Sequence, residues 1–476
     1  MQIIHYLLLY IIMNPYTIPA PDPGEDTTFT IQDWDEHGRP PILILQHGWT
    51  AIGEEAFVDA TELLMIRIPM SVLDIRMNAF KGATNLHQVD FVEGSRLEFI
   101  REGAFDSAIS LERIHIPAAV THIGHGAFNG AIGLEQVTFE QGSQLVMFGF
   151  QAFYGAISLT SIRIPASVTT IGHEAFRNAS SLVEVVFEEG SKLNFIGDAA
   201  FKDTTALQGF QVPSGVSEIG DGVFQNATSL ERINIPSSVT YIGRHAFYNA
   251  TSLREVTFEQ GSRLEIIREG AFMDATSLQT IQIPASVIDI RDLAFNNTPR
   301  LREITFEQNS QIGYIGINYT FSRSGLTNVF IGETALNRLN IHRQAHNLPP
   351  LRFGENNYFY GKSNVKIVSR TQQINTLAMI ARKPEYKKRG VVGRFQETFL
   401  GKPKIITRKS IPQDLVRKIG SLVTGIEPKS PAVLAARVAT AANARAGGAH
   451  KPRTRKRRAQ RTQKRKPKRR RTMKRK

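Results

Sequence analysis

The sequence predicts a solenoid of short parallel β-strands, with one strand in each repeat of 23–25 residues, followed by a disordered basic C-terminal tail. Three observations support this prediction. A motif of the form Ile-Gly-x-x-Ala-Phe recurs along most of the chain, an Ile-x-Ile alternation precedes many of its copies, and the last residues are mostly lysine and arginine. Self-similarity at a period of this length is the sequence signature of repeat architectures.

The phenylalanine of the motif marks the period. Its copies lie 23 or 25 residues apart, at Phe57, Phe80, Phe105, Phe128, Phe153, Phe176, Phe201, Phe224, Phe247, Phe272 and Phe295, with a degenerate copy ending at Phe321. In the unit from Ser110 to Ala131, Ile114 and Ile116 alternate with polar residues, which predicts a strand with both isoleucines inward. Strands that are always traversed in one direction stack into a parallel sheet, and the Val, Ile, Ala and Phe of the return segment fill the space behind it.

The repeats come in two lengths. In the longer ones, Phe-Glu-x-Gly-Ser replaces Ile-Pro, as at Phe258–Ser262, and adds two residues and a glycine. We expect this insertion to form a local turn on one edge of every second coil. Pro213 and Pro236, in adjacent repeats, break the alternation, so a change of curvature is expected there.

Over about residues 50–320, the motif resembles the BspA-like, or Treponema pallidum-type, leucine-rich repeats. The resemblance implies a leucine-rich-repeat solenoid that acts as a binding protein, since known members are mostly surface or secreted binding proteins of bacteria and protists, with copies in large DNA viruses. The chain departs from a typical surface member at its start. The apolar run Ile3–Met13 is shorter than the ~20 residues that span a bilayer, and no basic region precedes it as in a signal peptide. Met13 is an alternative start, and a secreted or surface adhesin remains the alternative function.

Charge divides the chain. Residues 1–350 hold 22 Lys and Arg against 38 Asp and Glu, whereas residues 351–476 hold 36 against 5. Such asymmetry favours an interaction tail. The predicted organisation is an N-terminal segment and cap (1–49), the solenoid (50–321), a C-terminal cap (322–350), a small, basic, partly helical adaptor region (351–450) and the tail (451–476).

The residues beside the inward strand positions are predicted to point outward onto the sheet. They vary freely from repeat to repeat, while the inward positions barely change. Varied side chains on a rigid extended sheet are how solenoids build binding surfaces, so we expect a protein partner to bind there. The candidate contact residues are Arg67, Asp90, Arg113, His115, Arg163, Glu184, Arg232, Asn234 and Glu255.

The tail holds 17 Lys or Arg and no acidic residue, a composition that favours disorder and binding to polyanions. Three interpretations stay open: a nuclear import signal, a nucleic-acid anchor that contacts phosphates without selecting sequence, and a tether to an anionic membrane or an acidic protein. The first two favour a nuclear or nucleic-acid-associated location, including the interior of a virion. The clusters are Arg455, Lys456, Arg457, Arg458, Lys464, Arg465, Lys466, Lys468, Arg469, Arg470 and Arg471.

Little in the sequence predicts catalysis. The absence of cysteine excludes disulfides, cysteine-ligated metal and thiol chemistry. Gly354 and the run Gly361–Ser363 miss the spacing of a phosphate-binding loop, and His122 and His125 have no carboxylate at ligand spacing. We therefore expect no catalytic, metal or cofactor site and no enzymatic activity. Three Asn-Ala-Ser/Thr sequons, at Asn178, Asn226 and Asn249, share one repeat register and are explained by duplication of one turn.

Overall fold

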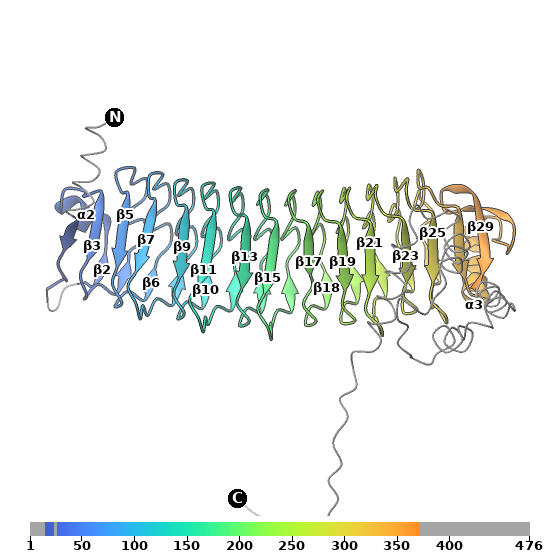
Figure 1. The fold of residues 1–476 in the computed structure, drawn as a ribbon, viewed down its shortest axis with the longest axis horizontal. Helices are drawn as coiled ribbons and strands as arrows, with labels where there is room; N and C mark the ends of the chain where they lie inside the picture. The colour runs from blue at the N-terminus through green and yellow to red at the C-terminus, as the bar shows by residue number, and fades with distance from the viewer. Residues whose placement is uncertain (1–14, 23–25, 371–476) are drawn as a thin grey trace, which may run out of the picture. The chain divides into compact units, whose positions relative to one another are not determined.

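The computed structural model describes residues 15–22 and 26–370, and every structural statement below concerns this part of the chain. The predicted tail, most of the predicted adaptor region and the apolar run at the N-terminus lie outside it. The described chain is a solenoid of parallel strands, as the sequence predicts, and Figure 1 shows successive turns lying side by side from β3 to β29.

Each regular turn places one strand in a main sheet. Its first eleven strands are paired in parallel and in chain order. They are β1 (Tyr16–Ile18), β3 (Ile42–Leu45), β5 (Met65–Ile68), β7 (Gln88–Phe91), β9 (Arg113–Ile116), β11 (Gln136–Phe139), β13 (Ser161–Ile164), β15 (Glu184–Phe187), β17 (Gly209–Gln211), β19 (Arg232–Ile235) and β21 (Glu255–Phe258). A further sheet, in the order given, continues the series with β23 (Thr280–Ile283), β25 (Glu303–Phe306), β27 (Asn328–Ile331), β29 (Lys362–Ser369) and β28 (Asn356–Phe359).

The return segment of each turn holds a second, two-residue strand. The first eight of these form one parallel sheet: β2 (Thr28–Phe29), β4 (Ala51–Ile52), β6 (Asp74–Ile75), β8 (Phe99–Ile100), β10 (His122–Ile123), β12 (Met147–Phe148), β14 (Thr170–Ile171) and β16 (Phe195–Ile196). The other five form another: β18 (Glu218–Ile219), β20 (Tyr241–Ile242), β22 (Ile266–Ile267), β24 (Asp289–Ile290) and β26 (Tyr314–Ile315). The core lies between the main strands and these short strands.

A ladder of phenylalanines runs through this core. The motif phenylalanines from Phe57 to Phe321 are all fully buried, and successive rings stack nearly parallel, with centroids 4.9 Å apart for Phe57 and Phe80 and 5.0 Å apart for Phe128 and Phe153. The repeat conserves phenylalanine at this position because each ring packs on its equivalents in the turns before and after it.

The ladder opens at one place. Phe201 and Phe224 lie 5.9 Å apart, and Phe210, from the intervening main strand, packs 4.9 Å from each of them. The second sheet is interrupted here, between β16 and β18, and β15 aligns with β17 through a single residue pair. At this point Pro213 and Pro236 place two short repeats in succession, and the change of curvature expected there stays a prediction.

The insertion in the longer repeats has a structural reason. The carboxylate of Glu140 accepts a hydrogen bond from the backbone N–H of Ala118 at 2.8 Å, and that of Glu188 accepts one from Ala166 at 3.1 Å. In both cases the donor belongs to the preceding, shorter turn and follows its proline. The segment therefore forms the predicted turn, and where its second residue is glutamate it also ties the long turn to the short turn before it.

Helix α2 (Ile31–Glu36) covers the N-terminal end of the core. Thr30 caps it: the backbone N–H of Asp33 bonds to the Thr30 hydroxyl, and that of Thr30 to the Asp33 carboxylate. The fully buried indole of Trp34 lies edge-on against Phe57, at 5.3 Å. This helix shields the first phenylalanine rings from water.

Helix α3 (Glu333–Ala345) covers the other end, with Leu336 and Leu339 buried. The guanidinium of Arg343, which is 1% exposed, donates to the carbonyls of Pro349 and Tyr358 and so fixes the chain that follows the helix. That chain then re-enters the sheet, because β29 pairs in parallel with β27 and antiparallel with β28. Residues 356–369, which the sequence analysis assigned to the adaptor region, are thus part of the sheet.

Candidate functional site

The strands of the main sheet, together with β23 of the sheet that continues it, expose two columns of side chains. We call these columns the sheet face: the outward residues of β5 to β23, from Met65 to Gln282. Strand pairing aligns these residues from turn to turn, as in Arg113 with Gln136 and Arg67 with Asp90. The inward neighbours, such as Ile114 and Ile116, are buried. The alternation predicted from the sequence therefore places varied polar residues on a surface held by a constant core.

All nine candidate contact residues lie on the sheet face. Asp90 and Glu255 are half-buried; the exposed members are Arg67, Arg113, His115, Arg163, Glu184, Arg232 and Asn234. The face is thus one surface to which seven turns contribute the nine candidates, and it gathers no compact cluster of the kind that catalysis requires.

Several polar side chains on the face bond to their neighbours. His115 lies 2.9 Å from the Thr138 hydroxyl, and the Thr257 hydroxyl donates to the Asn234 side chain at 2.9 Å. Four arginines differ: within the described chain they form no ion pair and no side-chain hydrogen bond. They are Arg67, Arg113, Arg163 and Arg232. Their guanidinium groups retain full capacity for planar, bidentate contacts with a partner.

The accessible surface ends at β25, which corrects one expectation of the sequence. Glu303 occupies an outward column whose other members are mostly exposed, yet it is only 3% exposed. This burial raises the pKa of its carboxyl to about 7, against a smaller opposing effect of the Thr305 hydrogen bond. Phe330 of β27, also in an outward position, is 5% exposed. Neither residue is available to a partner.

A third column, which the strand alternation does not predict, is formed by the residue directly before each strand. Glu112 and Glu135 are exposed there, and further along Arg254 forms an ion pair with Glu231. The signal was visible in the sequence, since this position varies as freely as the outward strand positions. It was missed because the strand alternation applies only within the strand, whereas this column belongs to the turn that leads into it.

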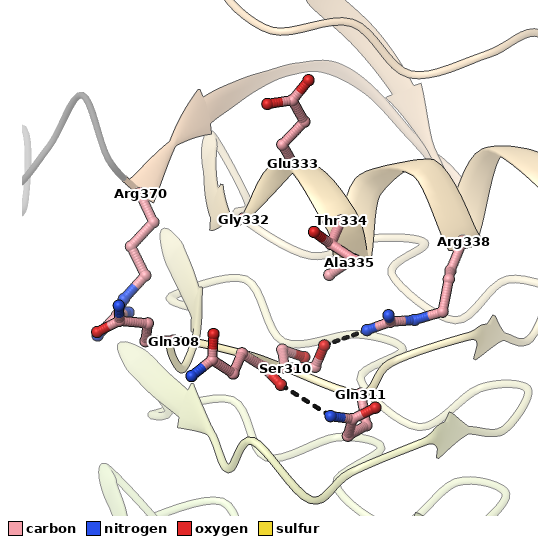
Figure 2. Close-up of a pocket in the computed structure, with 10 residues that line it drawn as sticks. Gln308, Ser310, Gln311, Gly332, Glu333, Thr334, Ala335, Arg338 and Arg370 are labelled. Carbon is pink, nitrogen blue, oxygen red and sulfur yellow. Dashed lines mark hydrogen bonds between the residues drawn. The ribbon is translucent and has the colours of Figure 1, made fainter.

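A pocket of about 350 Å³ lies between the last turns and the start of α3 (Figure 2). Arg338 reaches from the helix and donates to the carbonyls of Ser310 and Ile312, and Arg370 donates to the carbonyl of Phe306 at 2.8 Å. Both arginines donate to backbone carbonyls of the last turns and so attach the C-terminal cap to them. The pocket is therefore a gap left where the cap docks.

The weaker motifs do not assemble a reactive site. The ring of His122 lies against Phe99, 5.9 Å away, whereas His125 accepts the backbone N–H of Phe150. Gly354 and Gly361 have positive φ angles and lie next to the β28–β29 hairpin. Across the described ranges, no group of three or more metal-binding side chains comes together, and no helix has the length and hydrophobicity to cross a membrane.

Comparison of the sequence with family models finds six copies of the BspA-type leucine-rich repeat region, matched at residues 50–182, 146–264 and 258–345. Together these matches cover well over half of the chain. A search of curated proteins finds no match.

Solved leucine-rich-repeat structures are similar in fold. A leucine-rich cell surface protein of Faecalibacterium prausnitzii is 25% identical, covering 61% of this chain and 86% of its own, with a TM-score of 0.37. A leucine-rich repeat protein of Bacteroides ovatus is 19% identical, covering 75% and 92%, with a TM-score of 0.42. The leucine-rich repeat protein of T. pallidum is 17% identical, covering 55% and 82%, with a TM-score of 0.24.

Proposed function

This chain belongs to the BspA-type leucine-rich repeat family, and from that premise we propose that it is a non-enzymatic scaffold whose sheet face binds a protein partner. Leucine-rich-repeat proteins are generally interaction scaffolds and are typically not enzymes. The observation that carries the proposal is the set of four arginines on the sheet face without partners in the described chain, Arg67, Arg113, Arg163 and Arg232. Arginine is enriched at interface hot spots, and here it is presented by a rigid sheet.

A photo-crosslinking residue placed in the full-length protein tests this proposal. One variant carries it at Gln136, on the sheet face beside Arg113, and a control carries it at His122, which is exposed on the second sheet. In cells that express the protein, we expect a discrete adduct from position 136 only, which disappears when Arg113→Glu is added. The same adduct from both positions, or an adduct unaffected by Arg113→Glu, would contradict binding through the sheet face.

For the tail, we propose attachment to nucleic acid. The support is composition: 17 Lys or Arg in residues 451–476, with no acidic residue, behind a repeat region that is itself acidic. Contacts between such a segment and phosphates release counterions, so the logarithm of affinity falls linearly with the logarithm of salt concentration. Nuclear import is compatible with this proposal, because the same clusters serve both.

The test is the affinity of the full-length protein and of a truncation ending at residue 450 for random duplex DNA across a salt series. We expect steeply salt-dependent binding by the full-length protein and little by the truncation. If neither protein binds at low salt, the tail is an address or a protein tether instead. Removal of an N-terminal segment during export, detected by N-terminal sequencing, would favour the surface adhesin.

A further inference from the structure

One edge of the solenoid carries side chains that the repeat does not require. Four residues after each ladder phenylalanine, most turns place threonine or serine, as at Thr205, Thr228 and Thr251. Three consecutive turns place isoleucine instead. We call these the isoleucine stripe: Ile109, Ile132 and Ile157.

In four successive later turns, the threonine at this position bonds to the turn before it. The Thr205 hydroxyl donates to the carbonyl of Ser180 at 3.2 Å, Thr228 to that of Thr205 at 3.3 Å, and Thr251 to that of Thr228 at 3.4 Å. Isoleucine cannot make these bonds. Threonine at this position therefore fits the fold. The three adjacent turns that have isoleucine instead lose this hydrogen bond between turns.

The neighbouring column changes in two of these three turns, while the first keeps Ser107. Two residues after the phenylalanine, later turns form a polar ladder, in which Asn226 donates to Asp203 and Asn249 to Asn226. Beside the isoleucine stripe, Gly130 and Gly155 interrupt this ladder. Their φ angles of 64° and 68° match the left-handed backbone of the asparagines they replace, so the turn is conserved while its polar side chains are removed.

The isoleucine stripe is exposed and continuous. Its members are 39%, 43% and 44% exposed in chain order. The strands that follow them are aligned, Arg113 with Gln136 and Gln136 with Ser161, so the isoleucines lie on successive turns about 4.8 Å apart. Single exposed apolar residues are ordinary, whereas apolar residues that adjoin and have a polar border mark interaction sites.

Two carboxylates border the stripe. Glu112 and Glu135 follow Ile109 and Ile132 by three residues and are exposed. Within the described chain, neither carboxylate forms an ion pair or a side-chain hydrogen bond. Apolar side chains with unpaired negative charges beside them complement a segment that has an apolar face flanked by lysine or arginine.

We propose that the isoleucine stripe docks a basic amphipathic helix of a partner protein. In a helix with leucine at positions i, i+4 and i+7, the first two leucines lie about 6 Å apart along the axis and the last two about 4.5 Å apart. Both distances are close to the spacing of the turns. Lysines beside that apolar face reach Glu112 and Glu135. A second copy of this chain would bring the same carboxylates to the border, so repulsion disfavours self-association. The isoleucines are not part of the sheet face, although Glu112 and Glu135 directly precede its residues Arg113 and Gln136.

The test uses the full-length protein and a fluorescent helical peptide with leucine at i, i+4 and i+7 and lysine on both sides, followed by anisotropy. The main variant is Ile109→Thr/Ile132→Thr/Ile157→Thr, which we expect to keep its thermal midpoint because threonine is native to this register. We expect it to bind the peptide about tenfold more weakly or worse. Glu112→Gln/Glu135→Gln is expected to weaken binding several-fold and to reduce its salt dependence.

The control Ile288→Thr, at an isoleucine that is 46% exposed outside the stripe, should leave the affinity unchanged. The proposal is overturned if the triple threonine variant binds as tightly as the wild type. Equal binding of a peptide with glutamate in place of lysine would also overturn it, as would a stripe-dependent dimer in sedimentation, which would make a second copy the occupant.

Discussion

At the scale of single residues, the stability of this protein depends on a few positions that recur in every turn. The sequence identifies the inward positions correctly, because Ile114, Ile116 and the ladder phenylalanines never become polar and all are buried. It does not identify the burial of Glu303, because that residue occupies a column whose other members are mostly exposed. Periodicity predicts what a position does in an average turn and misses what is particular to one turn.

Phe153→Ala should be among the most damaging substitutions in the chain. The ring is fully buried and stacks on Phe128 at 5.0 Å and Phe176 at 5.3 Å, so its removal leaves a cavity in the ladder. We expect a loss of about 3–5 kcal/mol, measured as a lower thermal or urea midpoint. The control is Phe150→Ala, three residues away and 43% exposed, which should change stability by less than about 0.5 kcal/mol. Similar losses in both variants would contradict the ladder as the source of stability.

Glu303 should make stability depend on pH. Because its pKa is raised to about 7 in the folded protein from an ordinary value of 4.5, the folded state binds more protons than the unfolded state between these values. Its stabilising contribution is present below pH 4.5 and is lost as the pH rises through 7. Glu303→Gln should therefore stabilise the protein at pH 8 by roughly 1–3 kcal/mol and flatten the dependence. Glu184→Gln, exposed in the same column, is the matched surface control for the substitution and should be near neutral at pH 8.

At the scale of elements, many of the strands have only two residues. Side-chain hydrogen bonds between the loops of successive turns therefore add to the contacts that hold the turns together. The sequence predicts the turn in each Phe-Glu-x-Gly-Ser segment from its glycine and its two added residues. It does not predict that the glutamate accepts a hydrogen bond from a residue 22 positions earlier, as Glu188 does from Ala166. That contact depends on which loops adjoin across turns, and only the three-dimensional structure supplies this information.

Glu188→Ala tests this connection between turns. The substitution leaves the half-buried N–H of Ala166 without its acceptor, and we expect a loss of about 1–2 kcal/mol. Glu189→Ala is the matched control, since this neighbour is exposed and should be near neutral. Glu188→Gln should retain much of the stability, because its amide oxygen still accepts the bond. Chemical denaturation of the three variants side by side measures these differences, and equal midpoints for Glu188→Ala and Glu189→Ala would show that the bond contributes nothing.

At the scale of the whole solenoid, each turn contacts only its neighbours, so stability is set locally and the weakest junction determines where the structure opens. We expect that junction around β17, where the second sheet breaks and β15 aligns with β17 only at Glu184 and Gly209. The strands β7 and β9 also align at one residue pair, and the main sheet breaks between β21 and β23, but the short-strand sheet is continuous at both of those places. The sequence marks this location by two successive short repeats, from which it predicts a change of curvature and not a weak junction. It does not predict the cause, which is the insertion of Phe210 between two ladder rings, because the preceding repeats have a smaller residue at that position.

Gly209→Thr should strengthen this junction. A β-carbon at Gly209 would meet no atom within 4 Å, and its φ lies outside the left-handed region, so a β-branched residue fits the strand and should gain about 0.5–1 kcal/mol. In hydrogen exchange, we expect the amides of β17 to exchange faster than those of β13 in the wild type and to slow in the variant. Gly94→Thr is the control: its β-carbon would also be in open space, but its φ of 74° is strained for threonine, so it should destabilise. If β17 is already protected as well as β13, the solenoid has no weak junction there and opens elsewhere.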